Sequence, residues 1–166
     1  MTRPSFGIAW AASQKIYDPA DSGAKVARII GGHVEKNVNN PDPKQRWRNT
    51  CAVLMSYILN ETGMIIPATP GQTVSGADRR QYFFRVRNLI DFLKEQWGNP
   101  EVMNYPPADG GKFADKKGVI LFEISGWSDA KGHATLFDGR ICYDHCYFNE
   151  PEATYTTDLA NFWSLS

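Results

Sequence analysis

Residues 49–60 read Asn-Thr-Cys-Ala-Val-Leu-Met-Ser-Tyr-Ile-Leu-Asn and predict a buried helix. Asn49 and Thr50 are good N-cap residues, and Gly63 is a natural stop. Apolar side chains recur at helical spacing and cover more than one face, so we expect most of this helix to be inside the protein. Cys51 then lies in the first turn, where unpaired N–H groups and the helix dipole favour the thiolate that thiol chemistry requires.

Helices are also predicted on either side of this segment. Asp21 or Ser22 caps a short helix that ends at Gly31-Gly32, and a stripe of apolar residues predicts a longer helix over 78–97. Pro, Gly and polar residues predict irregular chain or loop elsewhere in the first two thirds, at 1–20, 37–48, 64–77 and 98–117.

The last third of the chain has the pattern of strands. Residues 118–124 read as a buried strand, and 133–137 and 140–143 as two strands joined by Asp138-Gly139. Asp-Gly between two such runs favours a two-residue type I′ hairpin. A further strand is expected over 153–157 and a short final helix over 158–163. The sequence therefore predicts one α+β domain over residues 1–166, with N-terminal helices packed on a C-terminal antiparallel sheet.

A histidine and an aspartate fall at matching places in the predicted hairpin. Pairing around Asp138-Gly139 puts His133 directly opposite Asp144, with the two Cβ atoms ~4.5–5.5 Å apart. An imidazole at that distance can be oriented by the carboxylate and can serve as base to a cysteine nucleophile. We therefore predict that Cys51, His133 and Asp144 form a Cys-His-Asp catalytic set. Taken singly, each has a structural explanation: an inert core thiol, a satisfied strand histidine and a turn cap.

Composition limits the function classes. The chain has 166 residues, and its 18 basic residues balance 18 acidic ones, so the basic excess of a nucleic-acid binder is missing. No apolar run is long enough to span a membrane, and nothing in the charge balance favours a membrane surface. The apolar run over 6–12 is short for the core of a signal peptide, so we expect none.

Three blocks in order resemble the type VI secretion amidase effectors of family 4: Asn-Thr-Cys-Ala-Val-Leu-Met-Ser-Tyr (49–57), Gly-His-Ala-Thr-Leu-Phe-Asp-Gly (132–139) and Cys-Tyr-Asp-His-Cys (142–146). The resemblance implies a papain-like, NlpC/P60-type fold. It also implies hydrolysis of the γ-D-glutamyl–meso-diaminopimelate bond in peptidoglycan stem peptides. Cys51 matches the family nucleophile, His133 the base and Asp144 the orienting acid. The first thirty residues match least clearly.

The same resemblance implies partners and a place of action. The protein would be made in the cytoplasm, exported by the type VI secretion machinery without a signal peptide, and active in the periplasm of a rival bacterium. A cognate immunity protein would block its cleft, and no metal or organic cofactor would be needed. The resemblance also implies a Cys142–Cys146 disulfide. The chain must turn between these cysteines if they pair, because an extended chain holds them ~13 Å apart.

Three other functions remain open from the residues alone. Cys142, Asp144, His145 and Cys146 are possible zinc ligands, although structural zinc usually uses two separated ligand pairs. The five tryptophans would suit a non-catalytic cell-wall binding module. Of these, Trp47 and Trp127 are near the predicted site and are candidates to line a substrate groove. A Cys-His-Asp set also serves transglutaminases and thioesterases, since it does not name the acyl acceptor.

Overall fold

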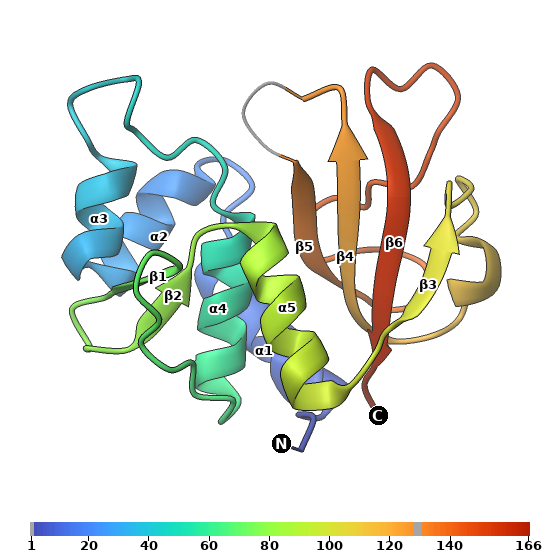
Figure 1. Ribbon diagram of the computed structural model, residues 1–166, viewed down its shortest axis with the longest axis horizontal. Coiled ribbons are helices and arrows are strands. Elements are labelled where there is room, and N and C mark those ends of the chain that lie inside the picture. Colours follow the sequence, from blue (N-terminus) through green and yellow to red (C-terminus); the bar gives the residue numbers. More distant parts are fainter. Residues whose placement is uncertain (1, 128–130) are drawn as a thin grey trace.

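Helices from the first hundred residues lie on one side of the molecule, and the strands of the last third lie on the other (Figure 1). The structure, a computed structural model, describes residues 2–127 and 131–166. In chain order the elements are α1 (Phe6–Ile16), α2 (Ser22–Ile30), α3 (Gly32–Val38), α4 (Cys51–Glu61), β1 (Thr73–Ser75), β2 (Gln81–Phe83), α5 (Val86–Trp97), β3 (Glu101–Asn104), the 3-10 turn η1 (Gly111–Phe113), β4 (Gly118–Ser125), β5 (Gly132–Phe137) and β6 (Thr156–Ser164).

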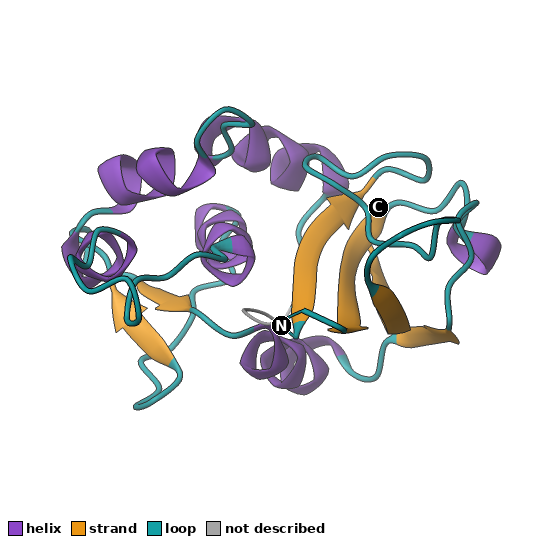
Figure 2. Cartoon of the chain, turned by 90° about the horizontal axis from the view of Figure 1, so that it is seen from above, coloured by secondary structure: helices purple, strands orange, loops and turns teal. Residues whose placement is uncertain are grey.

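The four strands of the main sheet are antiparallel in the order β3-β6-β4-β5, and both faces of this sheet are buried. Val119 and Leu121 of β4 face a core shared with α1, α4 and α5. Ile120 and Phe122 face the opposite way, into a second core with Phe148. This explains why the sequence of β4 is apolar throughout rather than alternating. Seen at right angles in Figure 2, the α-helices again lie to one side of the sheet, whereas the short 3-10 turn η1 lies on the other. The predicted α+β fold is therefore confirmed.

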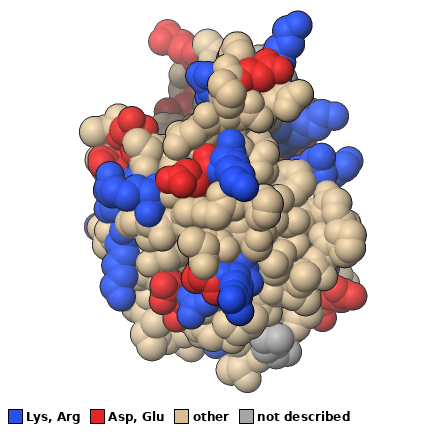
Figure 3. Space-filling model, turned by 90° about the vertical axis from the view of Figure 1, so that its left-hand side faces the viewer, with Lys and Arg blue, Asp and Glu red and all other residues tan. Residues whose placement is uncertain are grey.

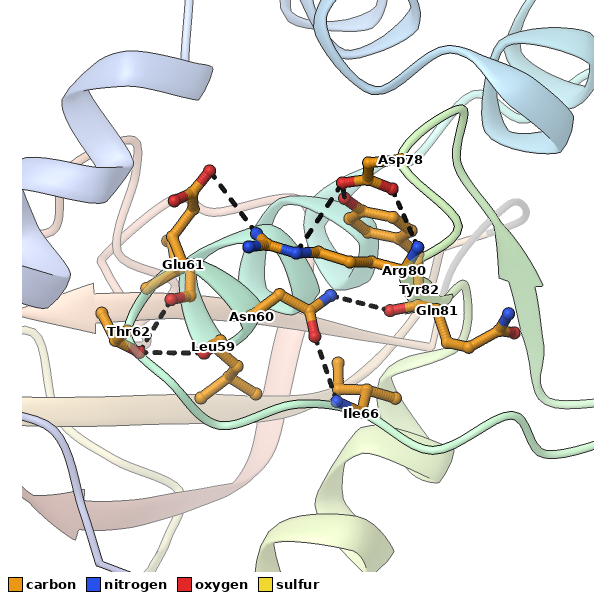
Figure 4. Close-up of polar contacts among 10 residues, drawn as sticks. Leu59, Asn60, Glu61, Thr62, Ile66, Asp78, Arg80, Gln81 and Tyr82 are labelled. Atoms are coloured by element: carbon orange, nitrogen blue, oxygen red, sulfur yellow. Dashed lines mark hydrogen bonds and ion pairs between the residues drawn. The ribbon is translucent and has the colours of Figure 1, made fainter.

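Helix α4 is the central helix, and its residues 51–60 are all buried, as the sequence predicts. Polar side chains on α4 attach it to the small hairpin of β1 and β2. Asn60 Nδ2 donates to Gln81 O at 2.8 Å, and its Oδ1 accepts from Ile66 N at 3.0 Å (Figure 4). The hydroxyl of Ser56 accepts from Phe83 N at 2.9 Å. The buried side chains of Asn60 and Ser56 therefore both have hydrogen-bond partners, as burial requires.

Those hydrogen bonds explain a wrong prediction. The helix expected over 78–97 begins only at Val86, because residues 81–83 are extended as β2 and hydrogen-bonded to α4. The Asp78 carboxylate accepts from the Tyr82 hydroxyl at 2.9 Å and holds the turn before β2 (Figure 4). The helical spacing of apolar residues in the sequence extends back into the residues of β2. The start of the helix is therefore set by tertiary contacts and not by this spacing.

Other segments also differ from the prediction. The first twenty residues, expected to be irregular, contain α1, whose buried residues Phe6, Ala9 and Ile16 have helical spacing. Helix α3 lies partly in the expected loop 37–48. The strand and helix expected over 153–163 are instead one strand, β6, which pairs with both β3 and β4. Pairing on both sides overrides the helical pattern of Leu159–Trp163.

The hairpin prediction was partly wrong. Strand β5 ends at Phe137 as expected, but 140–143 do not form a second strand. The side chain of Asp138 accepts from the amides of Arg140 and Ile141, both at 2.8 Å, and Asp138 N donates to Ile141 O. The turn therefore spans 138–141, and the bridge beyond it pairs Phe137 with Cys142. Asp144 falls opposite Thr135, two residues from the predicted partner His133.

In the described residues, every helix falls short of the length and apolar character needed to cross a membrane. Helix α1, the run considered as a signal-peptide core, packs against α4 in the main core.

Candidate active site

Cys51 is the first residue of α4 and lies next to the start of β5. Its side chain is buried, and Sγ lies 3.9 Å from the carbonyl oxygen of Gly132. Asn49 Oδ1 accepts a hydrogen bond from the Cys51 amide at 3.0 Å, so Asn49 caps the helix although Thr50 is the N-cap residue. The Cys51 amide, at the first turn of α4, therefore already has an acceptor in Asn49.

His133 is held between Asp144 and Cys51. Its Nε2 lies 2.8 Å from Asp144 Oδ2, an ion pair in which the N–H does not point straight at the oxygen. The Cys51 side chain also acts on the imidazole and raises its pKa. The contact between His133 and Asp144 that the sequence predicts is therefore present. It is a diagonal contact rather than one between directly opposite residues.

Burial and charge act on His133 in opposite directions. Burial lowers the pKa of the imidazole, but Asp144 and the Cys51 side chain outweigh it and raise the pKa of His133 to about 10. A positively charged imidazole beside Sγ is the partner that a cysteine nucleophile requires. The raised pKa therefore keeps the His133 imidazole protonated at neutral pH.

Thr135 is a neighbour of the site that the sequence interpretation missed. Its hydroxyl donates to Asp144 Oδ1 at 2.6 Å, while Oδ2 of the same carboxylate faces His133. Thr135 is fully buried, and it lies two residues after His133, so both side chains are on one face of β5. The spacing of two along a strand was the signal that could have identified it.

Tyr147 also contacts His133, and nothing in the sequence pointed to it. Its ring centroid lies 4.6 Å from that of His133 and 4.6 Å from that of His145. The Cys142–Cys146 disulfide closes the turn that carries Asp144, with the two Cα atoms 5.3 Å apart. The expected disulfide is therefore present, and it occupies the two cysteines that the zinc alternative would need as ligands.

Cys51 opens onto two cavities. The smaller, of about 380 Å³, contains His133, Asp144 and Tyr147 in its wall. The larger, of about 1030 Å³, extends away from Cys51 along the loop before α4. Trp127 lines both cavities, and Trp47 lines the larger one, where it stacks on Phe84 with ring centroids 5.1 Å apart. Both candidate groove residues therefore lie beside Cys51.

Comparison with protein-family models matches residues 47–163, more than half of the chain, to "Type VI secretion system (T6SS), amidase effector protein 4". A comparison of the sequence with curated proteins gave no match.

Solved structures give similarity over nearly the whole chain. Tae4 from Salmonella typhimurium, solved with the immunity protein Tai4 from Enterobacter cloacae, is 39% identical. The match covers 99% of this chain and 100% of that one, with a TM-score of 0.83. Tae4 from Enterobacter cloacae, in a complex with Tai4, is 34% identical over 99% and 100% of the chains, with a TM-score of 0.87. Another solved structure, of the type VI effector Tae4 from Enterobacter cloacae, is 35% identical over 99% and 98% of the chains, with a TM-score of 0.84.

Proposed function

The chain belongs to the family of type VI secretion amidase effectors called Tae4, and on this premise we propose that it hydrolyses the γ-D-glutamyl–meso-diaminopimelate bond of peptidoglycan stem peptides. Cys51 is the nucleophile, His133 the acid and base, and Asp144 the group that orients His133. The observation that carries the proposal is the arrangement of these three side chains in the wall of one cavity, with His133 paired to Asp144 and its pKa raised by both neighbours.

The proposed reaction is acyl transfer through a thioester. The Cys51 thiolate attacks the γ-carbonyl carbon of D-glutamate and forms a C–S bond, and protonated His133 gives its proton to the amine of diaminopimelate as the C–N bond breaks. Water then attacks the thioester, and its proton passes to His133. The C–S bond then breaks, which restores the Cys51 thiolate beside the imidazolium, and the γ-carboxyl group leaves as a carboxylate after its remaining proton passes to solvent. Asp144 stays ionised throughout and stabilises the charged imidazole.

The family premise extends to the biology of the protein. An effector of this family is exported, and we infer that this chain acts in the periplasm of a rival bacterium, where the cross-linked stem peptides lie. The relatives from Salmonella typhimurium and Enterobacter cloacae were solved with Tai4 immunity proteins. We infer that an immunity protein of the same kind binds this chain and covers the cavities beside Cys51.

The test is digestion of purified Gram-negative peptidoglycan, with products identified by mass spectrometry. Wild type should release fragments cut between D-glutamate and diaminopimelate, and Cys51→Ala should release none. Near-ultraviolet circular dichroism of the variant controls for folding. Lack of cleavage by folded wild type would refute the proposal and favour a binding module. Transfer of the glutamyl group to an added amine in preference to water would favour a transglutaminase.

A further inference from the structure

The larger cavity beside Cys51 is a groove between two segments that are distant in sequence. Residues 43–49, the loop before α4, form one wall, and residues 84–87, at the start of α5, form the other. Trp47 from the first segment stacks on Phe84 from the second, which ties the two walls together. Cys51 and Gly132 also line this groove, so it can receive a peptide bound at the proposed nucleophile.

Basic side chains dominate the lining of this groove. Among the described residues that line it, the charged side chains are Lys44, Arg46, Arg48, Arg85, Arg87 and Lys131, against one carboxylate, Glu123. Asn161 Nδ2 donates to Glu123 Oε2 at 2.9 Å, so part of that carboxylate is already bound. The charge is local: the whole sequence has a formal net charge of zero. On the face drawn in Figure 3, basic and acidic side chains are interspersed.

Two of the six basic side chains have structural roles. Arg46 donates to Asn40 O at 2.8 Å, and Arg85 donates to Gly71 O at 3.1 Å while lying over the ring of Phe84. The other four are exposed. Across 2–127 and 131–166, no carboxylate forms an ion pair with Lys44, Arg48, Arg87 or Lys131. The groove therefore holds several positive charges that the described residues do not neutralise.

The N-terminus of α5 adds to this positive potential. Val86 and Arg87, the first residues of this 12-residue helix, line the groove, and its N-cap residue Arg85 makes no side-chain cap. The partial positive charge at this helix end is therefore not offset by an acidic or hydroxyl cap, and it favours an anionic group nearby.

We propose that this groove binds carboxylates of the substrate, with Arg48, Arg87 and Lys131 as specificity-determining residues. The inference rests on the proposed function and deepens it. A γ-linked D-glutamate keeps its α-carboxylate free, and meso-diaminopimelate in a stem peptide keeps one of its two carboxylates free. Both flank the scissile bond. Arg48 lines both cavities at Cys51, and guanidinium groups suit carboxylates because they bind them in a planar, two-pronged manner.

The experiment measures binding without cleavage. A synthetic peptide with the γ-D-glutamyl–diaminopimelate bond is titrated into Cys51→Ala, alone and combined with Arg48→Gln, Arg87→Gln or Lys131→Gln. The matched control is Lys94→Gln, which removes one exposed charge from α5 outside the groove. We expect each groove substitution to raise the Kd about fivefold, because an exposed ion pair is worth up to about 1 kcal/mol. The control should leave Kd unchanged.

Two further peptides identify the carboxylate. One carries an amide in place of the D-glutamate α-carboxylate, and the other an amide in place of the free diaminopimelate carboxylate. If an amide at one position weakens binding and the groove substitutions then have no further effect, the carboxylate at that position is the one that the groove binds. Three results would each overturn the inference. The groove variants could bind the peptide as tightly as the Lys94→Gln control does. The peptide could fail to bind Cys51→Ala, or all three peptides could bind equally well.

This experiment separates the inference from the proposed function. The digestion of peptidoglycan by wild type tests the function, whereas binding to Cys51→Ala tests the groove whether or not cleavage occurs. With active wild type as background, the groove substitutions should raise KM and leave kcat near its original value, because they act on binding and not on the reacting groups. A fall in kcat with unchanged KM would contradict the role in specificity.

Discussion

Asp144, together with the Cys51 side chain, raises the pKa of His133. The raised pKa of about 10 means that the imidazole carries a proton through neutral pH and loses it only as the pH rises toward 10. The stabilising contact with Asp144 is therefore fully present below the ordinary pKa of 6.5 and is lost as pH rises through the folded value. If the active form is thiolate with imidazolium, activity must fall on the alkaline side with the same titration.

Asp144→Asn tests this assignment. The amide keeps the shape of the side chain but removes the negative charge, so the alkaline limb of the kcat/KM profile should move to lower pH by about 1–3 units. The Cys51→Ala variant is the control that measures hydrolysis of the substrate without the enzyme's catalysis. An unchanged alkaline limb, with only a lower rate, would mean that Asp144 positions His133 without setting its charge.

Thr135 is predicted to act through Asp144. Thr135→Val has almost the same shape but cannot donate to Asp144 Oδ1, so the carboxylate loses one of its two anchors. A hydrogen bond to a charged group contributes about 1.5–3 kcal/mol, so we expect kcat to fall at least about tenfold with little change in KM.

Thr135→Ser keeps a hydroxyl and is the matched control for this variant. It should retain most of the wild-type kcat and the wild-type pH profile. If kcat falls equally in the Val and Ser variants, Thr135 has only a packing role. The same conclusion follows if the substitutions change the melting temperature and leave kcat unchanged.

At the scale of elements, the turn between Cys142 and Cys146 carries the orienting acid. The disulfide closes a very short loop and on the entropic model stabilises the fold by only about 2 kcal/mol. We infer that its larger consequence is to hold Asp144 against His133 and Thr135. An oxidising periplasm would keep the bond formed, whereas a cytosol favours reduction.

We therefore predict that the reduced enzyme is less active. Wild-type activity is compared with and without a thiol reductant, together with the double variant Cys142→Ala/Cys146→Ala. Reductant should lower wild-type kcat toward that of the double variant, which itself should not respond. Equal wild-type activity in both conditions would show that the disulfide is not needed to place Asp144.

The elements also show where sequence patterns stop being informative. Helix α4 was predicted well because its cap, apolar pattern and stop signal all lie within it. The turn after β5 was not, because Asp-Gly favours a two-residue turn, and here the Asp138 side chain binds two amides and lengthens it. Strand β6 was mistaken for a helix because its pairing with β3 and β4 involves residues far away in the sequence.

The candidate site was predictable in its members but not in its geometry. Cys51, His133 and Asp144 were identifiable from a helix start, a strand start and a turn. The contact between His133 and Asp144 was predicted from a register that is wrong by two residues. The basic groove was not predictable, because residues 43–49 and 84–87 come together only through packing.

At the scale of the whole molecule, the site lies where the helical half meets the sheet. Cys51, the proposed nucleophile, comes from α4, whereas His133 and Thr135 come from β5 and Asp144 from the turn after it. The core shared by α1, α4, α5 and the sheet fixes one half against the other. Catalysis by this set therefore depends on the complete domain rather than on either half.

Trapping the acyl group tests the central claim, acyl transfer through Cys51, most directly. Hydroxylamine competes with water for a thioester, so digestion of a stem peptide in its presence should yield the γ-hydroxamate of D-glutamate together with free diaminopimelate amine. We predict that wild type forms this hydroxamate and that Cys51→Ala forms none. Cleavage that gives only the carboxylate at every hydroxylamine concentration, or cleavage that persists in Cys51→Ala, would contradict the account.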